Sequence, residues 1–338
     1  MIDFSSFLNL PLIFGYIMGF AIFMYVILDG FDLGVGILFP FAPTQKCRDQ
    51  MMHSIAPFWD GNETWLVLGG MVLFAAFPPA YSIILPALYI PIIIMLIGLI
   101  FRGVAFELRH KAKTRNELRI WDYSFHFGSL VTAFFQGVIL GAFIQGFRVN
   151  GWFFTGHAWD WLTAFSLTSG VAVTFSYMLL GSVWTIMKTG RKTRFWARSA
   201  ALYSLAFVVF FIILATFWTP FVNRDLAIRW FLFNDFFYLM QIPVFIGITV
   251  FFLVNSLVAK RRSSIPFLLT IVLFTLGYVG IGLSVFPYVV PYKLTFALAA
   301  AAPTSLSFLL VGIALILPVI LGYTAFSYYV FRGKVSDT

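Results

Sequence analysis

A chain of 338 residues that is 61% hydrophobic, 20% aromatic and only 10% charged cannot bury its apolar surface as a soluble domain. Its mean hydropathy of +0.94 requires lipid as a solvent, and its single cysteine excludes an internal disulfide and any multi-cysteine metal or iron–sulfur site. The net charge of +9 reflects basic residues in short loops between apolar runs, so it indicates membrane topology and not a nucleic-acid partner.

Long continuous apolar runs predict transmembrane helices, because the strands of a β-barrel would alternate in hydrophobicity over about ten residues. The first ten residues have no basic region and no small-residue cleavage site, so we interpret the first run as a retained helix. Nine helices are expected. They are 10–39, 55–77, 82–101, 123–147, 161–187, 200–221, 236–258, 266–285 and 305–331.

Basic residues fix the expected orientation of these helices. Of the 22 lysines and arginines, 18 fall in alternate loops on one side and 4 in the loops between. The positive-inside rule therefore predicts an external N-terminus and a cytoplasmic C-terminus. The richer set is Lys46, Arg48, Arg102, Arg109, Lys111, Lys113, Arg115, Arg119, Lys188, Arg191, Lys192, Arg194, Arg198, Lys260, Arg261, Arg262, Arg332 and Lys334, and the poorer set is Arg148, Arg224, Arg229 and Lys293.

Nine helices allow two groups of four and one left over. We expect a first four-helix bundle over residues 1–150, which carries the acidic motifs, and a second over 151–290. A peripheral ninth helix and a cytoplasmic tail would occupy 291–338. No internal sequence repeat is visible, and the break between the bundles falls in the outer loop 148–160.

Four carboxylates lie within the first two predicted helices: Asp29, Asp32, Asp60 and Glu63. The two acids of each helix are three residues apart and so share a helix face. At ~1.5 Å per residue, Asp32 and Asp60 lie about 10 Å from the cytoplasmic boundary, with Asp29 and Glu63 one turn deeper. Antiparallel packing of the two helices would join the four acids in one polar track that leads inward from the cytoplasm.

Ionisable groups at membrane depth cost several kcal/mol and usually have a function. Clustered carboxylates at low dielectric cannot all be ionised, which favours a proton relay. Two structural alternatives remain open: each acid pairs with an interior Lys or Arg, or it caps backbone groups near the glycines. No basic residue lies inside the first two predicted helices, which weakens the ion-pair interpretation. Capping stays credible for Asp29 and Asp32.

Tryptophans and glycines surround these acids. Trp59 and Trp65 are expected to pack between helices, and the alternative is that they flank a cavity. Gly30, Gly34 and Gly36 have the spacing of small residues that let helices approach closely.

The four histidines bear on haem binding. A transmembrane bis-histidine site needs two residues at matched depth on facing helices. His53 and His126 both fall at cytoplasmic helix ends, so they form the one candidate pair. His110 lies in a basic loop and His157 in an outer loop. Because no histidine lies deep in a predicted helix, we expect this chain to bind no haem or metal of its own.

Three segments carry a family resemblance: DGFDLGVG at 29–36, SIAPFWDGNETWL at 54–66 and FAAFPPAY at 74–81. They resemble subunit II of the cytochrome bd-type quinol oxidases, cyanide-insensitive types included. The resemblance implies a multi-pass subunit of a respiratory complex in the bacterial plasma membrane that oxidises quinol and reduces O2 to water. A homologous subunit I would carry haem b, haem d and the quinol site. Subunit II would be haem-free and without catalytic activity alone.

The resemblance also implies roles for individual residues and further partners. The proton pathway of the family includes the aspartate that matches Asp60, and oxygen entry in some members lies near the tryptophan that matches Trp65. Some members hold a structural quinone in subunit II, and a small single-helix accessory subunit is a further expected partner besides membrane lipids. The positions of Glu63, Asp32 and Asp29 in the acidic track add them to the expected proton pathway.

Two other functions are compatible with the acids. A proton-coupled secondary transporter also uses acids near glycines in discontinuous helices, but it should bind substrate near the midplane. The fifth to ninth predicted helices have no midplane ionisable residue, which disfavours a transporter. A pure assembly scaffold would leave the acids dispensable.

Overall fold

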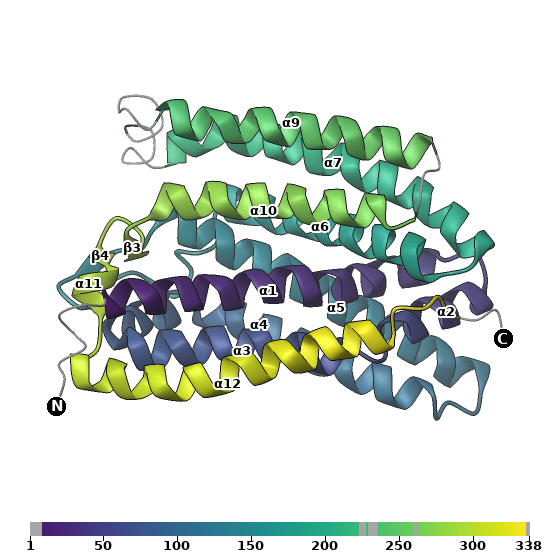
Figure 1. Cartoon of the computed structure of the whole chain (residues 1–338), viewed down its shortest axis with the longest axis horizontal. Helices are drawn as coiled ribbons and strands as arrows, with labels where there is room; N and C mark the ends of the chain where they lie inside the picture. Colours follow the sequence, from purple (N-terminus) through teal and green to yellow (C-terminus); the bar gives the residue numbers. More distant parts are fainter. Residues whose placement is uncertain (1–8, 223–227, 229–235, 260–262, 336–338) are drawn as a thin grey trace.

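The computed structural model describes residues 9–222, 228, 236–259 and 263–335. Long helices dominate, and Figure 1 shows them side by side along the longest axis of the molecule. In chain order the helices are α1 (Leu10–Leu38), η2 (Phe39–Phe41), α2 (Gln45–Ile55), α3 (Trp59–Ala76), α4 (Pro78–Arg109), α5 (Arg115–Gln145), α6 (Ala164–Lys188), α7 (Arg191–Val222), α9 (Phe236–Val258), α10 (Ile265–Val285), α11 (Phe296–Ala299) and α12 (Pro303–Val330).

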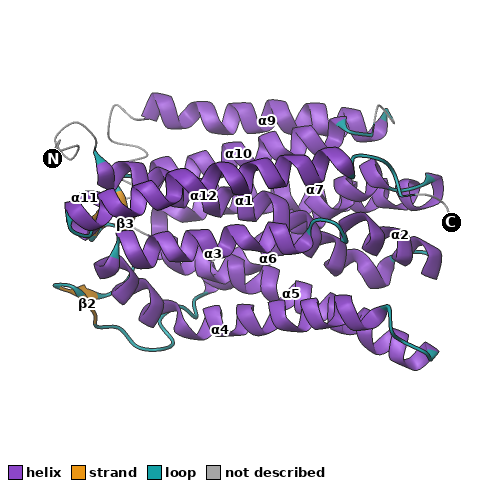
Figure 2. Cartoon of the chain, turned by 60° about the horizontal axis from the view of Figure 1, so that its bottom comes forward, coloured by secondary structure: helices purple, strands orange, loops and turns teal. Residues whose placement is uncertain are grey.

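Within the described ranges, eight helices are long and apolar enough to cross a membrane: α1, α4, α5, α6, α7, α9, α10 and α12. Helix α3 runs alongside them in Figures 1 and 2 but is not among the eight. It has only 18 residues, and Asp60, Asn62 and Glu63 make its first turns polar. The ninth transmembrane helix therefore stays a prediction that depends on α3.

Several expected boundaries are wrong: α5 begins at Arg115 and α7 at Arg191, well before the expected residues 123 and 200, and two further differences affect the acids. The second predicted helix, 55–77, is broken: α2 ends at Ile55 and α3 begins at Trp59. Pro57 lies in the turn between them, where it supplies no backbone N–H and disfavours helical geometry at the preceding residue. The third predicted helix, 82–101, continues through the expected inner loop as far as Arg109, so Arg102 lies inside a helix.

Helix α1 lies in the middle of the molecule and packs against α3, α5 and α6 (Figure 1). Its contact with α6 is so close that a Cβ added at Gly34 would lie 1.8 Å from the backbone oxygen of Tyr177. A Cβ added at Gly181 would likewise meet the backbone of Gly34. The prediction that glycines serve helix packing is confirmed at Gly34, since only a residue without a side chain fits there.

Short strands close the end of the molecule at which α1 begins (Figure 1). Strands β1 (Val149–Asn150) and β2 (Phe153–Phe154) form one antiparallel hairpin, and β3 (Tyr288–Val290) and β4 (Leu294–Thr295) form another. Helix α2 lies at the opposite end, where α12 also finishes. The site described below lies between these ends, on α1, α3 and α4.

Helix α12 lies on the outside of the molecule, with 11% of its most apolar window buried. Its C-terminal end is nevertheless held firmly. The ammonium of the buried Lys188, at the end of α6, donates to the backbone oxygens of Phe331 at 2.5 Å and Gly333 at 3.4 Å. In return, the backbone N–H of Val335 donates to the oxygen of Lys188 at 2.9 Å. Lys188 thereby satisfies carbonyl groups that the helix itself leaves open.

Candidate functional site

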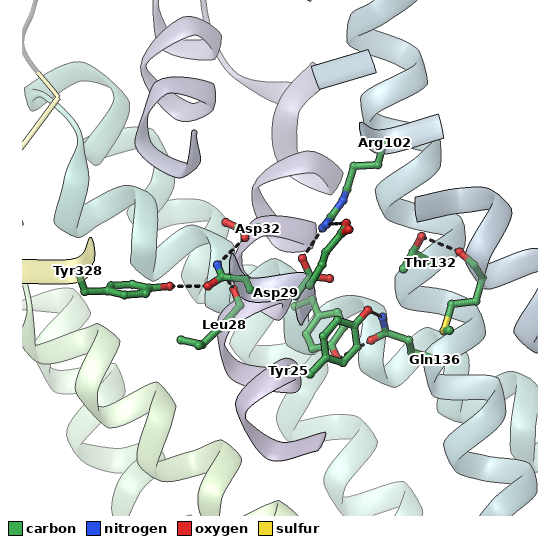
Figure 3. A network of polar contacts seen from close by, with 12 residues as sticks. Tyr25, Leu28, Asp29, Asp32, Arg102, Thr132, Gln136 and Tyr328 are labelled. Carbon is green, nitrogen blue, oxygen red and sulfur yellow. Dashed lines mark hydrogen bonds and ion pairs between the residues drawn. The ribbon is translucent and has the colours of Figure 1, made fainter. Parts of the chain in front are cut away.

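A buried arginine joins two of the predicted site residues. Arg102 on α4 donates from Nη1 to Oδ1 of Asp29 on α1 at 2.7 Å, and from Nη2 to Oε1 of Glu63 on α3. The side chains of Arg102 and Asp29 are 2% and 0% exposed, whereas that of Glu63 is 31% exposed. Figure 3 shows the guanidinium reaching down from α4 toward Asp29. Three helices therefore meet at one cation.

The structure shows the ion-pair alternative for Asp29 and Glu63, although the sequence disfavours it because no basic residue lies inside the first two predicted helices. The partner Arg102 lies on the third predicted helix, just beyond the end expected at residue 101. A signal for its burial exists in the sequence: Gly103-Val104-Ala105-Phe106 continues the apolar run beyond Arg102, up to Glu107. A lone arginine inside an apolar run indicates a buried cation with an acidic partner.

A polar branch leads from the cluster to the peripheral helix α12. Oδ2 of the buried Asp32 accepts a hydrogen bond from Nδ2 of Asn62 at 2.7 Å. The same nitrogen also donates to the backbone oxygen of Leu28 at 3.2 Å, and Oδ1 of Asn62 accepts from the Tyr328 hydroxyl at 3.0 Å (Figure 3). Asn62 is 1% exposed, so it is a member of the site that sequence analysis missed. The signal in the sequence that could have identified Asn62 is its position between Asp60 and Glu63.

A second branch leads across the bundle toward α6. The Tyr25 hydroxyl interacts with Asp29, one turn along α1. That hydroxyl accepts from Nε2 of Gln136 on α5 at 2.5 Å, and Oε1 of Gln136 accepts from the Tyr177 hydroxyl on α6 at 2.7 Å. Figure 3 shows Tyr25 and Gln136 directed at each other. Sequence analysis missed all three residues, because tyrosine and glutamine at single positions carry no recognisable pattern.

Asp60 lies at the edge of the cluster and not in its centre. Its carboxylate is exposed on the surface of this chain, one turn before Glu63 on α3. It interacts electrostatically with Glu107 and Arg102 of α4. The four acids therefore differ in exposure: Asp60 is exposed, Glu63 is half-buried, and Asp29 and Asp32 are fully buried.

The charge balance of the buried cluster is uneven. Arg102 supplies one positive charge to Asp29, Glu63 and the nearby Asp32. Three ionised carboxylates around one cation at low dielectric would repel one another. Three buried atoms of these residues have no hydrogen-bond partner among the described residues: Asp29 Oδ2, Asp32 Oδ1 and Arg102 Nε. Such atoms normally contact ordered water, the medium through which protons pass between side chains.

The two tryptophans pack as expected. Trp65 is 0% exposed and meets the ring of Phe20 edge-on, with 5.7 Å between ring centroids. The ring centroids of Trp59 and Phe106 are 5.0 Å apart. A cavity of about 190 Å³ lies at the hairpin end, where Arg148 and Asp160 line it, away from both tryptophans. The indole N–H of Trp65 has no partner within the described chain.

A second arginine cluster lies farther along α4, beyond the expected membrane depth. Arg109 donates from Nε to Oδ1 of Asp122 at 2.6 Å and from Nη2 to Oδ1 of Asp49 at 2.8 Å. Nε of Arg48 lies 3.6 Å from Oδ2 of Asp122. Two arginines thus face two aspartates, and this cluster is neutral.

His53 and His126, the candidate pair of haem ligands, make contacts with different partners. His126 engages the backbone oxygen of Ile37 through Nδ1 at 2.9 Å, whereas the ring of His53 lies beside that of His110, with 5.8 Å between centroids. Nothing in the described contacts joins His53 to His126. Groups of three or more His, Cys, Asp or Glu side chains that could hold a metal ion do not occur among the described residues.

Comparison with known proteins gives consistent matches. The family model for cytochrome bd terminal oxidase subunit II matches residues 10–331. The chain is 31% identical over 321 residues to cytochrome bd ubiquinol oxidase subunit 2 of Bacillus subtilis (strain 168), a match that covers 92% of this chain and 93% of that protein. It is 28% identical over 375 residues to cytochrome bd-I ubiquinol oxidase subunit 2 of Escherichia coli (strain K12), with 99% and 97% covered.

A solved structure has the same fold. The bd oxidase from Geobacillus thermodenitrificans contains a chain that superposes with a TM-score of 0.78 and covers 95% of this chain and 98% of its own. The sequence identity is 16%, so this likeness concerns the fold alone.

Proposed function

The chain belongs to the cytochrome bd terminal oxidase subunit II family, and we propose that its acid cluster around Arg102 carries protons from the cytoplasm toward the site of oxygen reduction. As a member of that family, the chain is a subunit of a quinol:oxygen oxidoreductase, a respiratory terminal oxidase of the bacterial inner membrane. The oxidase is a haem-bearing complex of this subunit and a subunit I partner. The comparisons give the transporter alternative no support.

The observation that carries the proposal is the surplus of buried carboxylates over cations around Arg102. Reduction of oxygen to water consumes protons, which must reach a buried site through groups that bind and release them. Burial increases from the exposed Asp60 through the half-buried Glu63 to the buried pair Asp29 and Asp32. Their order matches a route that begins at the exposed Asp60 and ends at the buried pair on α1.

Topology supports the direction of this route. We infer nine transmembrane helices, with α3 as the ninth, an external N-terminus and a cytoplasmic C-terminus. Two four-helix bundles would occupy residues 1–150 and 151–290, followed by a peripheral helix in 291–338. The distribution of basic residues supports this orientation, although Arg224, Arg229 and the stretch 260–262 lie outside the described residues. It places α2 and the exposed Asp60 toward the cytoplasm.

Haem is assigned to the partner. A histidine in the membrane interior is the usual protein ligand of haem b, and the four histidines of this chain do not fit such a site. We infer that haem b, haem d and the site of quinol oxidation belong to subunit I. A bound structural quinone, lipids and a small single-helix subunit would complete the assembly.

One face of α3 supports burial against that partner. Asp60, Thr64, Val67, Met71 and Phe74 recur every three or four residues and are all exposed. An ionisable Asp60 that faced lipid would be costly, whereas a protein partner can hydrate it or pair it. We therefore place subunit I over this face. Trp65, on the adjacent face, would then lie near the interface, where oxygen entry in the family is expected.

Replacing Asp60 with Asn in the assembled oxidase tests the proton route. The amide keeps the shape but cannot exchange a proton, so the proton-transfer step should slow by about 10²–10⁴-fold, and turnover by less if another step limits. Haem content should not change. The matched control is Asp160→Asn, which removes a carboxylate of the outer loop. Wild-type turnover by the Asp60 variant from about pH 6 to about pH 9, with full haem, would refute the route.

A further inference from the structure

Two histidines meet at the end of the molecule where α2 lies. His53 belongs to α2, and His110 directly follows α4. Their rings are 5.8 Å apart between centroids, and both side chains are exposed. The residues lie far apart in sequence, so the fold alone brings them together. Nothing in the haem or ion-pair chemistry described above uses them.

The hydrogen bonding of His53 shows which nitrogen is free to bind a proton. Its Nδ1 lies 2.7 Å from the backbone oxygen of Asp49. A carbonyl oxygen only accepts hydrogen bonds, so Nδ1 carries the hydrogen and Nε2 is the basic nitrogen. Protonation at Nε2 can therefore occur without loss of the bond to Asp49.

The surroundings of His110 favour its neutral form. Burial lowers the pKa of His110 below its usual value, and the nearby His53 and Arg109 lower it further, while Glu107 and Asp49 act in the opposite direction. A histidine with a lowered pKa is neutral near pH 7, so it can receive a proton and release it quickly.

A carboxylate connects this pair to the proposed proton route. Glu107 lies one turn before His110 on α4 and is exposed. It interacts electrostatically with Asp60 on the neighbouring α3. Asp60 lies one turn from Glu63, which binds Arg102. Titratable groups thus continue from the two histidines to the buried cluster.

We infer that His53, His110 and Glu107 form a proton collector that takes protons from the cytoplasm and delivers them to Asp60. The inference rests on the proposed function, because a collector needs the route that begins at Asp60. Each step moves only a proton, from water to an imidazole, then to the Glu107 carboxylate and on to the carboxylate of Asp60. Grouped imidazole and carboxylate side chains exchange protons rapidly with water and with one another at an entrance where free protons are scarce.

The test is the double variant His53→Gln/His110→Gln in the assembled oxidase. Bulk protons suffice at low pH, so turnover should fall by about threefold at about pH 8.5 and by less than about 1.5-fold at about pH 6. Added imidazole, a mobile proton carrier, should restore the rate at high pH. The matched control is His157→Gln, since His157 is an exposed histidine of the outer loop. Glu107→Gln gives a second variant, at an exposed position of α4.

The outcomes separate the collector from the route. If turnover at about pH 8.5 is unchanged in both the double variant and Glu107→Gln, the collector is overturned. The proposed route remains intact in that case as long as Asp60→Asn slows turnover. A loss that is equal at all pH values and insensitive to imidazole also overturns it, because a structural defect behaves in that way. If Asp60→Asn itself turns over normally, the proposed route fails first.

Discussion

Helix α4 carries two buried arginines, Arg102 and Arg109, and each bridges two carboxylates from other helices. Around Arg109, the second arginine Arg48 balances the charge, and Asp49 is 41% exposed. Around Arg102, one cation faces Asp29, Glu63 and the nearby Asp32 at membrane depth. The two sites have similar hydrogen bonding but different charge balance.

This difference distinguishes a balanced ion cluster from the site that we propose to carry protons. A neutral cluster satisfies its groups and has no reason to exchange protons, whereas a surplus of carboxylates must bind them. Burial alone does not distinguish the two sites, since both arginines are almost fully buried. The surplus of carboxylates is the feature on which we base the proposed role of the Arg102 site.

The largest effect is expected from Arg102→Gln. The change leaves Asp29 and Glu63 without their shared cation, and breaking a buried ion pair in this way costs about 3–5 kcal/mol. The complex should accumulate poorly and lose haem, as measured by copurification of subunit I and the haem spectrum. Arg102→Lys is the matched variant, which keeps the charge but loses one of two directed bonds. Normal assembly of Arg102→Gln would show that the acids are neutral without the arginine.

Arg109→Gln should destabilise the oxidase less, by about 1–3 kcal/mol. Arg48 remains beside Asp122, and Asp49 can turn to water. The midpoint of thermal unfolding should fall while turnover per haem is retained. If Arg109→Gln keeps its thermal stability but loses turnover, Arg109 would serve turnover and not only stability. The proposed difference between Arg102 and Arg109 would then be wrong.

The smallest effect is expected from Tyr328→Phe, which removes one hydrogen bond to Asn62 at the edge of the Arg102 cluster. The net loss should be about 0.5–1.5 kcal/mol, since a single neutral hydrogen bond is removed and the ring remains. Its stacking on Phe58, with 4.4 Å between centroids, persists. A thermal shift comparable to that of Arg109→Gln would mean that Asn62 holds Asp32 more firmly than its geometry indicates.

Sequence analysis located the acids but not the charge that organises them. Apolar run length predicts most helices, because the bilayer sets a minimum length that a sequence must meet. It fails at Arg102, where one charge ends an apolar window although the helix continues through Phe106. The hydrogen bonds of Asn62 and Gln136 depend on which helices become neighbours, and no spacing within one helix records that.

The partnership of Lys188 with the end of α12 has a consequence for biogenesis. Helix α12 follows all the other described helices in the chain, so the ammonium of Lys188 awaits its carbonyl partners until the ribosome has released that segment. A chain truncated before Phe331 would retain this ammonium without its two carbonyl partners. Closure of the bundle around Lys188 therefore has to wait for the last of the described helices.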